Sequence, residues 1–327
     1  MIIVDAVNEM NLPLMATGSL AERLRVMPAV VVTGARQTGK TTLVQDLVPG
    51  RRRYLSLDDL DVMDAARRDP DSLLGGEGPV TPVEVQREPE LLHAAKRVDD
   101  WRRTPGHFLL TWSANLLLMR QVLESLAGRA SYLTFCPMTP GEQRGLGRGG
   151  GSEELLAARD QDWLDLLAAQ PDDALDWREL ASRGGFPTPA LQLKTASDRA
   201  VWFDGYVRTY LERILQDLSS IAALPDFHRL MRATARRLRQ LVNQTELGCD
   251  VALSQPTAQR YLNLLETSYL LVRLPACSVN RTKRLIKSPK LYWADTGLAL
   301  NLAGGDKPVG AQFENLVLQR LMAWRDS

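Results

Sequence analysis

Short apolar runs alternate with amphipathic segments through the first 140 residues of the chain. The β-branched run at residues 30–33 predicts a buried strand, and further strands are predicted at residues 54–57, 80–85, 108–111 and 132–135. Helical periodicity is present at residues 20–26, 41–48 and 63–68. Alternating strands and helices indicate a mainly parallel sheet with helices on both faces. We therefore expect an α/β domain over residues 28–140, preceded by a lead-in over residues 1–27.

A glycine-rich stretch follows this domain. Residues 141–152, GEQRGLGRGGGS, contain six glycines in twelve residues, and regular structure is entropically costly for such a segment. The composition predicts a flexible linker. Helical periodicity returns at residues 153–170, 177–183 and 196–219, so we expect residues 153–225 to form a helical lid or connector.

The next part of the pattern predicts three helices followed by two strands. The helices are expected at residues 227–242, at 246–251 and after Ser254, a good N-cap residue with Pro256 in the first turn behind it. The strands are expected at residues 269–274 and 290–295. This order is that of a winged helix, which we place at residues 226–300, with residues 301–327 as the start of a further domain. The third helix is expected to bury Ala258, Tyr261, Leu262, Leu265 and Tyr269.

The outward side of that third helix holds candidates for nucleic-acid recognition. Gln259, Arg260 and Asn263 are residue types that contact base edges or phosphates, and Lys283 and Arg284 lie in the basic segment NRTKRLIKSPK. Residues 226–290 hold 12 Lys and Arg against 4 Asp and Glu, although the whole chain has a net charge of +1. This excess favours an anionic partner such as nucleic acid. A solvated face, or a domain that packs only as a lid or a contact between protomers, explains it equally well.

Composition narrows the class of protein. The longest apolar runs are far shorter than the roughly 18 to 20 residues that cross a bilayer, and MIIVDAV lacks the basic start and cleavage site of a signal peptide. Cys136, Cys249 and Cys277 have neither the number nor the spacing of a disulfide framework or a zinc site. We therefore expect a cytoplasmic protein that makes no membrane contact.

A phosphate-binding loop is the most specific motif of the chain. Residues 34–41, GARQTGKT, satisfy GxxxxGK[ST] between a predicted strand and a predicted helix. The two glycines permit close approach of backbone N–H groups to phosphate oxygens. The lysine is expected to reach the β and γ phosphates, and the following threonine to hold Mg²⁺ at the start of the helix. We therefore predict that ATP and Mg²⁺ bind at Gly34, Ala35, Arg36, Gln37, Thr38, Gly39, Lys40, Thr41 and Thr42, with Thr41 as the metal ligand.

Hydrolysis requires more than this loop. A carboxylate on a neighbouring strand must hold the water shell of the metal, and a further residue must orient the attacking water. In GPVTPVEVQREPELL, residues 78–92, Glu84 stands at the water-activating position, but Val83 occupies the metal-holding position and cannot coordinate. Pro82 removes a ladder hydrogen bond from what should be a central strand. The sequence therefore predicts nucleotide binding with weakened hydrolysis.

With these motifs the chain resembles prokaryotic AAA-type P-loop ATPases joined to a carboxyl-terminal domain of uncharacterised function. The resemblance covers nearly the whole chain. It rests on the segments TGARQTGKTTL, YLSLDD, VEVQREPELL, FLLTWSANLLL, SLAGR, GGFP, YVRTYLER and SPKLYWADTGLA.

The resemblance implies roles for particular residues. Glu84 matches the catalytic glutamate, and Val83 replaces the aspartate that usually precedes it. Ser113 is the implied sensor of the γ-phosphate. Arg129 is either a phosphate-contacting arginine or a solvated or structural one. Such ATPases also need an arginine from a neighbouring protomer, which implies a homo-oligomer or a partner protein.

The chain departs from the family pattern at several positions. Trp112 stands where glycine is usual, and its indole is expected to crowd the nucleotide. Ile214 occupies the last place of the usual YLERD. Relatives continue past the position of Ser327 into a nuclease-like fold, which we expect to be incomplete here. Two functions stay open: an ATP-binding protein with weakened hydrolysis, and a nucleic-acid-binding adaptor or regulator.

Overall fold

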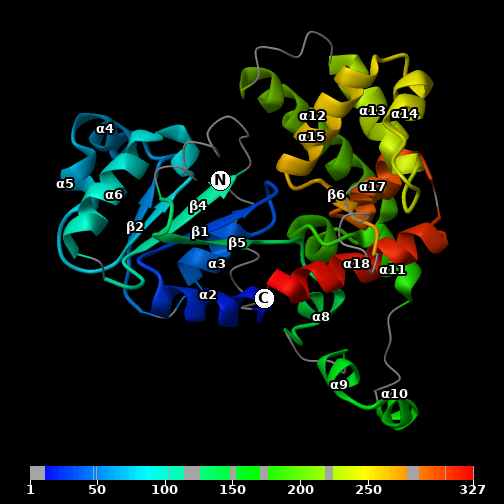
Figure 1. Ribbon diagram of the computed structural model, residues 1–327, viewed down its shortest axis with the longest axis horizontal. Helices are drawn as coiled ribbons and strands as arrows, with labels where there is room; N and C mark the ends of the chain where they lie inside the picture. Colours follow the sequence, from blue (N-terminus) through cyan, green and yellow to red (C-terminus); the bar gives the residue numbers. More distant parts are fainter. Residues whose placement is uncertain are drawn as a thin grey trace.

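The first half of the molecule is built on one sheet of five strands (Figure 1). The computed structural model describes residues 12–46, 48, 50–102, 104–113, 126–147, 152–169, 176–217, 224–277, 287–305 and 307–326. Neighbouring strands are parallel and lie in the order β2-β3-β4-β1-β5, so their carboxyl ends share one edge. The α/β prediction for this half is confirmed. The strands are β1 (Ala29–Gly34), β2 (Arg53–Ser56), β3 (Val80–Val83), β4 (Phe108–Ser113) and β5 (Ala130–Thr134).

Helices cover both faces of the sheet, because alternate residues of a strand point to opposite sides. Val30 and Val32 of β1 pack with residues of α2 (Ala16–Val26) and α3 (Lys40–Asp46). Val31 of β1 points the other way, into a core shared with three further helices. These are α4 (Leu60–Arg68), α5 (Pro70–Leu74) and α6 (Glu90–Arg102).

The second half of the molecule, from Trp177 to Asp326, is mainly helical. Its helices surround one core (Figure 1). Phe203, Phe227, Leu262 and Trp293 are completely or almost completely buried in this core. The strands β6 (Leu271–Leu274) and β7 (Lys290–Trp293) form an antiparallel pair. Among all the described residues, no helix is long and apolar enough to cross a bilayer. The helices are α11 (Trp177–Arg183), the one-turn π-helix η3 (Thr188–Gln192), α12 (Ala196–Asp217), α13 (Leu224–Arg236), α14 (Gln244–Asp250), α15 (Gln255–Thr267), α17 (Thr296–Ala303) and α18 (Gly310–Asp326).

The predicted flexible linker at residues 141–152 was wrong at its beginning. Residues 141–143 belong to helix α8 (Pro140–Gln143), which starts with a capping box between Thr139 and Glu142. The Glu142 carboxylate is buried and also accepts a hydrogen bond from the backbone N–H of Met15 at 2.8 Å. This contact fixes the start of the segment to the first half of the molecule, which glycine content alone does not reveal. Residues 148–151 of the predicted linker lie outside the described residues.

Three other predicted boundaries were also wrong. The helix expected at residues 153–170 is divided into α9 (Ser152–Ala157), the 3₁₀ turn η2 (Asp160–Asp162) and α10 (Trp163–Ala168). Helix α13 stops at Arg236 rather than at residue 242, because the Arg239 N–H donates to the carbonyl of Leu291 on β7. The boundary at residue 300 falls inside α17. Helix α18 is hydrogen-bonded to Trp293 of β7 through the amide oxygen and the amide nitrogen of Asn315, so it packs as part of the second half.

The two halves are joined at the segment GGFP, residues 184–187. The Met138 N–H donates to the Gly185 carbonyl at 2.7 Å, and the Gly185 N–H donates to the buried carboxylate of Asp295, the N-cap of α17. Gly184 has a φ of +71°, and a Cβ there would lie 2.5 Å from Oδ1 of Asp295. Glycine is therefore required at this contact. The contact holds the second half against the carboxyl edge of the sheet.

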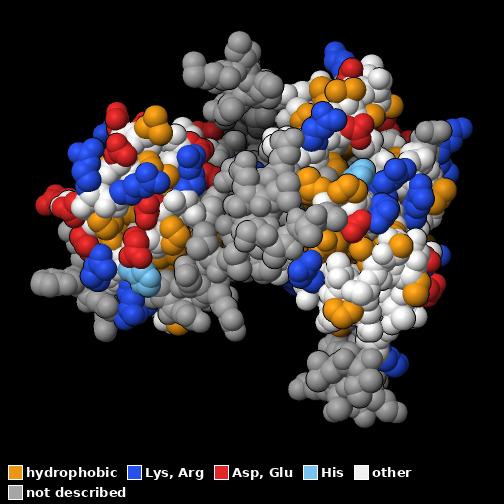
Figure 2. Space-filling view, turned by 90° about the horizontal axis from the view of Figure 1, so that it is seen from above, with side chains coloured by type: hydrophobic (Ala, Val, Ile, Leu, Met, Phe, Trp, Pro, Cys, Tyr) orange, Lys and Arg blue, Asp and Glu red, His pale blue; other side chains and the backbone are white. Residues whose placement is uncertain are grey.

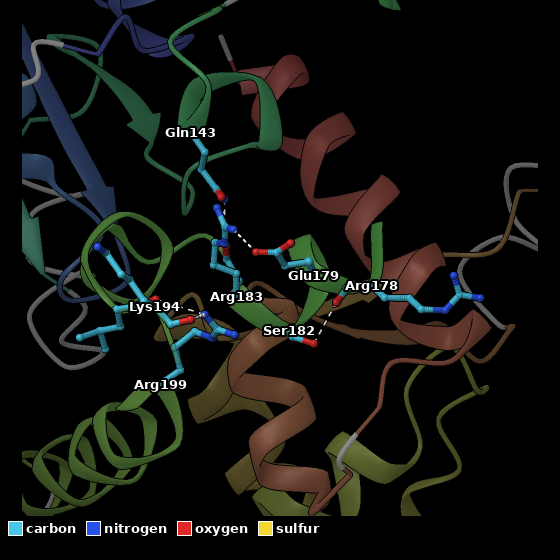
Figure 3. Close-up of polar contacts among 9 residues, drawn as sticks. Gln143, Arg178, Glu179, Ser182, Arg183, Lys194 and Arg199 are labelled. Atoms are coloured by element: carbon cyan, nitrogen blue, oxygen red, sulfur yellow. Dashed lines mark hydrogen bonds and ion pairs between the residues drawn. The ribbon is translucent and has the colours of Figure 1, made fainter. Parts of the chain in front are cut away.

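Polar contacts around α11 support the same junction (Figure 3). Gln143 of α8 donates to the Gly184 carbonyl at 2.8 Å, and Arg183 is paired with Glu179 one turn earlier. Arg199, at the start of α12, donates to the carbonyls of Leu193 and Lys194 at 3.1 and 3.2 Å. These two residues directly follow η3, so Arg199 connects the end of this turn to the long helix α12.

Candidate functional site

The loop at residues 34–41 connects β1 to α3 at the carboxyl edge of the sheet, as predicted. Gly34 and Gly39 have φ values of +149° and +95°, which are unfavourable for other residues. A Cβ on Gly34 would lie 2.3 Å from the carbonyl oxygen of Phe135, so this position also requires glycine for space. The backbone N–H groups of residues 39–41 find no acceptor among the described residues. The loop therefore offers unsatisfied donors at the start of a helix, which is a favourable place for a phosphate group.

Lys40 is buried inside this loop, with a relative exposure of 5%. Its Nζ donates to the carbonyls of Gly34 at 3.1 Å and Ala35 at 2.6 Å. Burial lowers the pKa of Lys40 to about 8; the nearby Glu84 carboxylate opposes this decrease, and the Arg36 guanidinium adds to it. A buried ammonium group that is held only by neutral carbonyls is ready to bind an anion.

Glu84 lies at the carboxyl end of β3, as predicted, but β3 is not a neighbour of β1. Strand β4 separates them, so the expectation of a neighbouring strand was wrong. Glu84 adopts a left-handed conformation with a φ of +57°, and its N–H donates to the Thr111 hydroxyl of β4 at 3.1 Å. Its carboxylate accepts a hydrogen bond from the Gln86 side chain. This unusual backbone is held by β4, as is typical of residues with a functional role.

Val83 points from β3 toward the face of the sheet that carries α3. It is 1% exposed and belongs to the same apolar cluster as Leu43 and Val44 of α3. No carboxylate is therefore available from this position. Among the described residues, no group of three His, Cys, Asp or Glu side chains is arranged to hold a metal ion. Thr41 is exposed in the first turn of α3, and Thr42 is half-buried beside it. The role of Thr41 as a Mg²⁺ ligand stays a prediction.

Pro82 interrupts the pairing of β3 with β4. The Val80 N–H donates to the His107 carbonyl at 2.8 Å, so Pro82, two residues further along, presents its nitrogen to the same neighbour. Because proline has no N–H, the next ladder bond is missing, as predicted. The paired register between these strands contains only Val80 and Phe108.

Trp112 lies in the core and not at the loop. Its side chain is 2% exposed and packs in the cluster that contains Val31 and Leu110, on the face opposite α3. The predicted crowding of a nucleotide by this indole was therefore wrong. Ser113, the predicted sensor, ends β4 in register with Gly34 of β1, which places its backbone beside the start of the loop.

Arg129 lies at the opposite edge of the sheet. Its carbonyl accepts a hydrogen bond from the N–H of Ala29, the first residue of β1, whereas the phosphate-binding loop follows the last residue, Gly34. Five residues of a strand span about 17 Å. Arg129 therefore cannot contact a phosphate in the loop of its own chain, which contradicts the first of its two predicted roles and leaves the solvated or structural one. The sequence had shown the residue type but not the strand order.

The residues that close over the loop were missed in the sequence analysis. A Cβ on Gly39 would lie 3.6 Å from Pro187, and the Tyr206 hydroxyl of α12 lies 3.5 Å from the carbonyl oxygen of Arg36. Arg36 and Gln37 line a pocket of about 240 Å³ together with residues of α12. Pro187 and Tyr206 belong to the segments GGFP and YVRTYLER, so the only signal for them was the family resemblance.

The nucleic-acid candidates are dispersed. Gln259 and Arg260 are exposed on α15, and the Arg260 guanidinium lies 5.3 Å from the ring centroid of Tyr261. Asn263 instead accepts a hydrogen bond at 2.8 Å from Arg273 of β6. Ser254 caps α15 as predicted. Lys283 and Arg284 lie outside the described residues.

Two family models match separate parts of the chain. Residues 26–143 match the family described as "AAA domain", and residues 174–308 match "Domain of unknown function (DUF8612)". An uncharacterized protein of Mycobacterium tuberculosis and another of Mycobacterium bovis are each 33% identical to this chain over 318 residues, which cover 94% of it. The chain spans 65% of the length of these relatives. Residues 26–143 are therefore similar to an AAA domain.

Proposed function

We propose, from the match of residues 26–143 to an AAA domain, that this protein binds ATP and that its hydrolysis of ATP is weak or absent. The observation that carries the proposal is the contrast between the loop and β3. The loop has its glycines, its buried Lys40 and unsatisfied N–H groups. On β3, an apolar Val83 fills the position from which a carboxylate would hold the metal.

Each site residue has a defined part in this proposal. The loop N–H groups and Lys40 bind the phosphates, and the Thr41 hydroxyl holds Mg²⁺. When bound, Mg²⁺ neutralises charge on the phosphate oxygens. Glu84 is the residue that orients and deprotonates a water molecule, and Ser113 senses the terminal phosphate. Several copies of the chain, or a partner protein, supply a further arginine from outside the chain, because Arg129 of a single copy lies at the other edge of the sheet.

The proposal is tested by measuring ATP binding and phosphate release together in the presence of Mg²⁺. We expect wild type to bind ATP and release little phosphate, and Lys40→Ala to lose binding. Lys96→Ala on α6, on the other face of the sheet, is the matched control and should bind like wild type. Turnover by wild type that depends on Lys40 would show that Glu84 and Thr41 suffice, and would overturn the role given to Val83.

A second candidate function is nucleic-acid binding by residues 224–293. Three helices, α13, α14 and α15, are followed by the antiparallel pair β6 and β7, which is the order expected of a winged helix. Lys and Arg side chains lie on both halves of the molecule (Figure 2), and on this half Arg229, Arg232, Arg236 and Arg237 line one hollow beside α13. Arg229 and Arg237 are paired with carboxylates, which weakens the positive charge of this surface.

This candidate is tested by titrating duplex DNA at low salt with wild type, Arg260→Ala and Lys283→Ala. A nucleic-acid-binding protein should lose salt-sensitive affinity in both variants while its ATP affinity stays unchanged. Wild type without DNA affinity at low salt would reject this function and leave the ATP proposal intact.

A further inference from the structure

The position of Lys40 shows which end of the loop faces the terminal phosphate. In a loop of this type the lysine reaches the β and γ phosphates. Here the Lys40 ammonium is hydrogen-bonded to the carbonyls of Gly34 and Ala35, at the beginning of the loop. The charge of Glu84, at the carboxyl end of β3, also acts on Lys40. The beginning of the loop is therefore the end at which the γ-phosphate would lie.

Arg36 is the next residue after these two carbonyls. It is half-buried and lines the pocket of about 240 Å³ between the loop and α12. Its charge acts on both Lys40 and Tyr206. A guanidinium group presents N–H donors in a planar fork that matches phosphate oxygens and is always charged. Arg36 thus adds a second cation to a loop that already holds Lys40 and that offers the backbone N–H groups of residues 39–41.

Helix α12 contacts the backbone of the loop at Arg36. Tyr206 is almost completely buried and stacks between Trp202 and Tyr210, with ring centroids 5.4 and 6.3 Å away. Its hydroxyl is directed at the carbonyl of Arg36, 3.5 Å away. Because the ring is fixed by its aromatic neighbours, the hydroxyl is a rigid support for the backbone of Arg36.

We propose that the Arg36 guanidinium contacts the terminal phosphate of bound ATP and makes binding selective for ATP over ADP, with Tyr206 as the residue that positions Arg36. The inference rests on the proposed function, in that it requires nucleotide to bind at the loop. In this arrangement a single chain has its own arginine at the phosphates, namely Arg36. Arg129 cannot take this role because it lies at the other edge of the sheet. It also connects the recognition of the phosphate to α12, and through α12 to the second half of the molecule.

The test is calorimetric titration of a non-hydrolysable ATP analogue and of ADP, both with Mg²⁺. We expect Arg36→Ala to weaken binding of the analogue by about tenfold or more, as for a lost hydrogen bond between charged groups, and to leave ADP binding nearly unchanged. Arg36→Lys should recover part of the preference, since it keeps the charge but not the fork. Arg129→Ala is the matched arginine control and should keep the wild-type preference.

Tyr206→Phe tests the positioning residue. It keeps the aromatic stack and removes only the hydroxyl, so we expect a smaller loss of analogue affinity with ADP affinity preserved. A merely structural role would instead weaken both nucleotides together or lower the melting temperature alone. Thermal melting of each variant without nucleotide identifies any that fail to fold.

The outcomes separate failure of this inference from failure of the proposed function. If wild type binds neither nucleotide, or if Lys40→Ala binds like wild type, the proposed function is wrong and the inference is wrong with it. If binding depends on Lys40 but Arg36→Ala changes both affinities equally or neither, the ATP proposal stands and the role of Arg36 is rejected.

Discussion

At the scale of the residue, the two decisive positions are Lys40 and Val83. Lys40 is nearly inaccessible to solvent and is bonded to carbonyls of its own loop, whereas Val83 is packed among the apolar side chains of α3. Both identities were visible in the sequence. Their burial was not, and burial determines the pKa of Lys40 and the cost of placing a charge at position 83.

The pKa of Lys40 predicts a pH dependence of ATP binding. Burial lowers this pKa from 10.5 to about 8, so below that pH the side chain is already charged in the free protein. Above it, binding of the polyanion requires uptake of a proton, and affinity should fall by at most about tenfold per pH unit. Titrating ATP across this range checks the prediction. Lys40→Arg, whose guanidinium does not titrate there, should show a much flatter profile if it still binds, and an equally steep profile in that variant would assign the effect to another group.

Val83→Asp should raise turnover. The new carboxylate would face α3 from the end of β3, where a metal-holding group is required. Without metal the variant should be less stable by a few kcal/mol, because the carboxylate is buried and unpaired. Phosphate release and thermal melting with and without Mg²⁺ and ATP check both effects. Val83→Asn is the control, because asparagine has the shape of aspartate but is neutral. Unchanged turnover in a folded Val83→Asp variant would mean that the weak hydrolysis is caused by Pro82 or by a missing partner.

At the scale of the element, local signals predicted most helices and strands but failed where a distant contact intervenes. The boundaries of α11 coincide with the predicted helix at residues 177–183, and Ser254 caps α15 as expected. Helix α8 was missed because the signal of six glycines pointed to a flexible linker. Its stability comes from Glu142, whose two oxygens accept the N–H groups of Met15 and Thr139.

Glu142→Gln should destabilise the protein although the two side chains have the same shape. Each carboxylate oxygen accepts a backbone N–H, so the amide NH₂ of glutamine would face one donor and leave it unsatisfied. We expect a loss of about 1–3 kcal/mol in the free energy of unfolding, measured by chemical denaturation. Glu154→Gln on the partly exposed α9 is the control and should be close to neutral. A variant as stable as wild type would mean that Glu142 does not hold α8.

At the scale of the whole molecule, the two halves are joined by a few buried contacts around Asp295. Its carboxylate accepts the N–H groups of Gly185 and Leu298, and so connects GGFP to α17. GGFP in turn packs beside the loop through Pro187. The junction therefore sets where α12 and Tyr206 lie relative to the nucleotide site.

Asp295 makes stability depend on pH. Burial raises its pKa from 3.8 to about 6, against the N–H groups that favour the ionised form. The folded state therefore favours the protonated carboxyl group. The contribution of this group to the free energy of unfolding is fully present below pH 3.8 and is lost as the pH rises through about 6. Asp295→Asn should be less stable than wild type because its NH₂ group faces N–H donors, and the difference should narrow as the pH rises through this interval. Denaturation of both proteins at several pH values checks this. A constant difference would show that Asp295 does not titrate in this range.

The sequence by itself determined the parallel α/β sheet, the phosphate-binding loop and the absence of a carboxylate at position 83, because strands, helices and this motif are encoded by residues close together in the chain. The tertiary structure alone decided that Arg129 lies at the wrong edge, that Trp112 points into the core and that Tyr206 meets Arg36. Strand order and the packing of α12 bring together residues that are far apart, such as Tyr206 and Arg36, separated by 170 positions. No local pattern reports such a pairing, since its free energy comes from burial shared by both halves of the molecule.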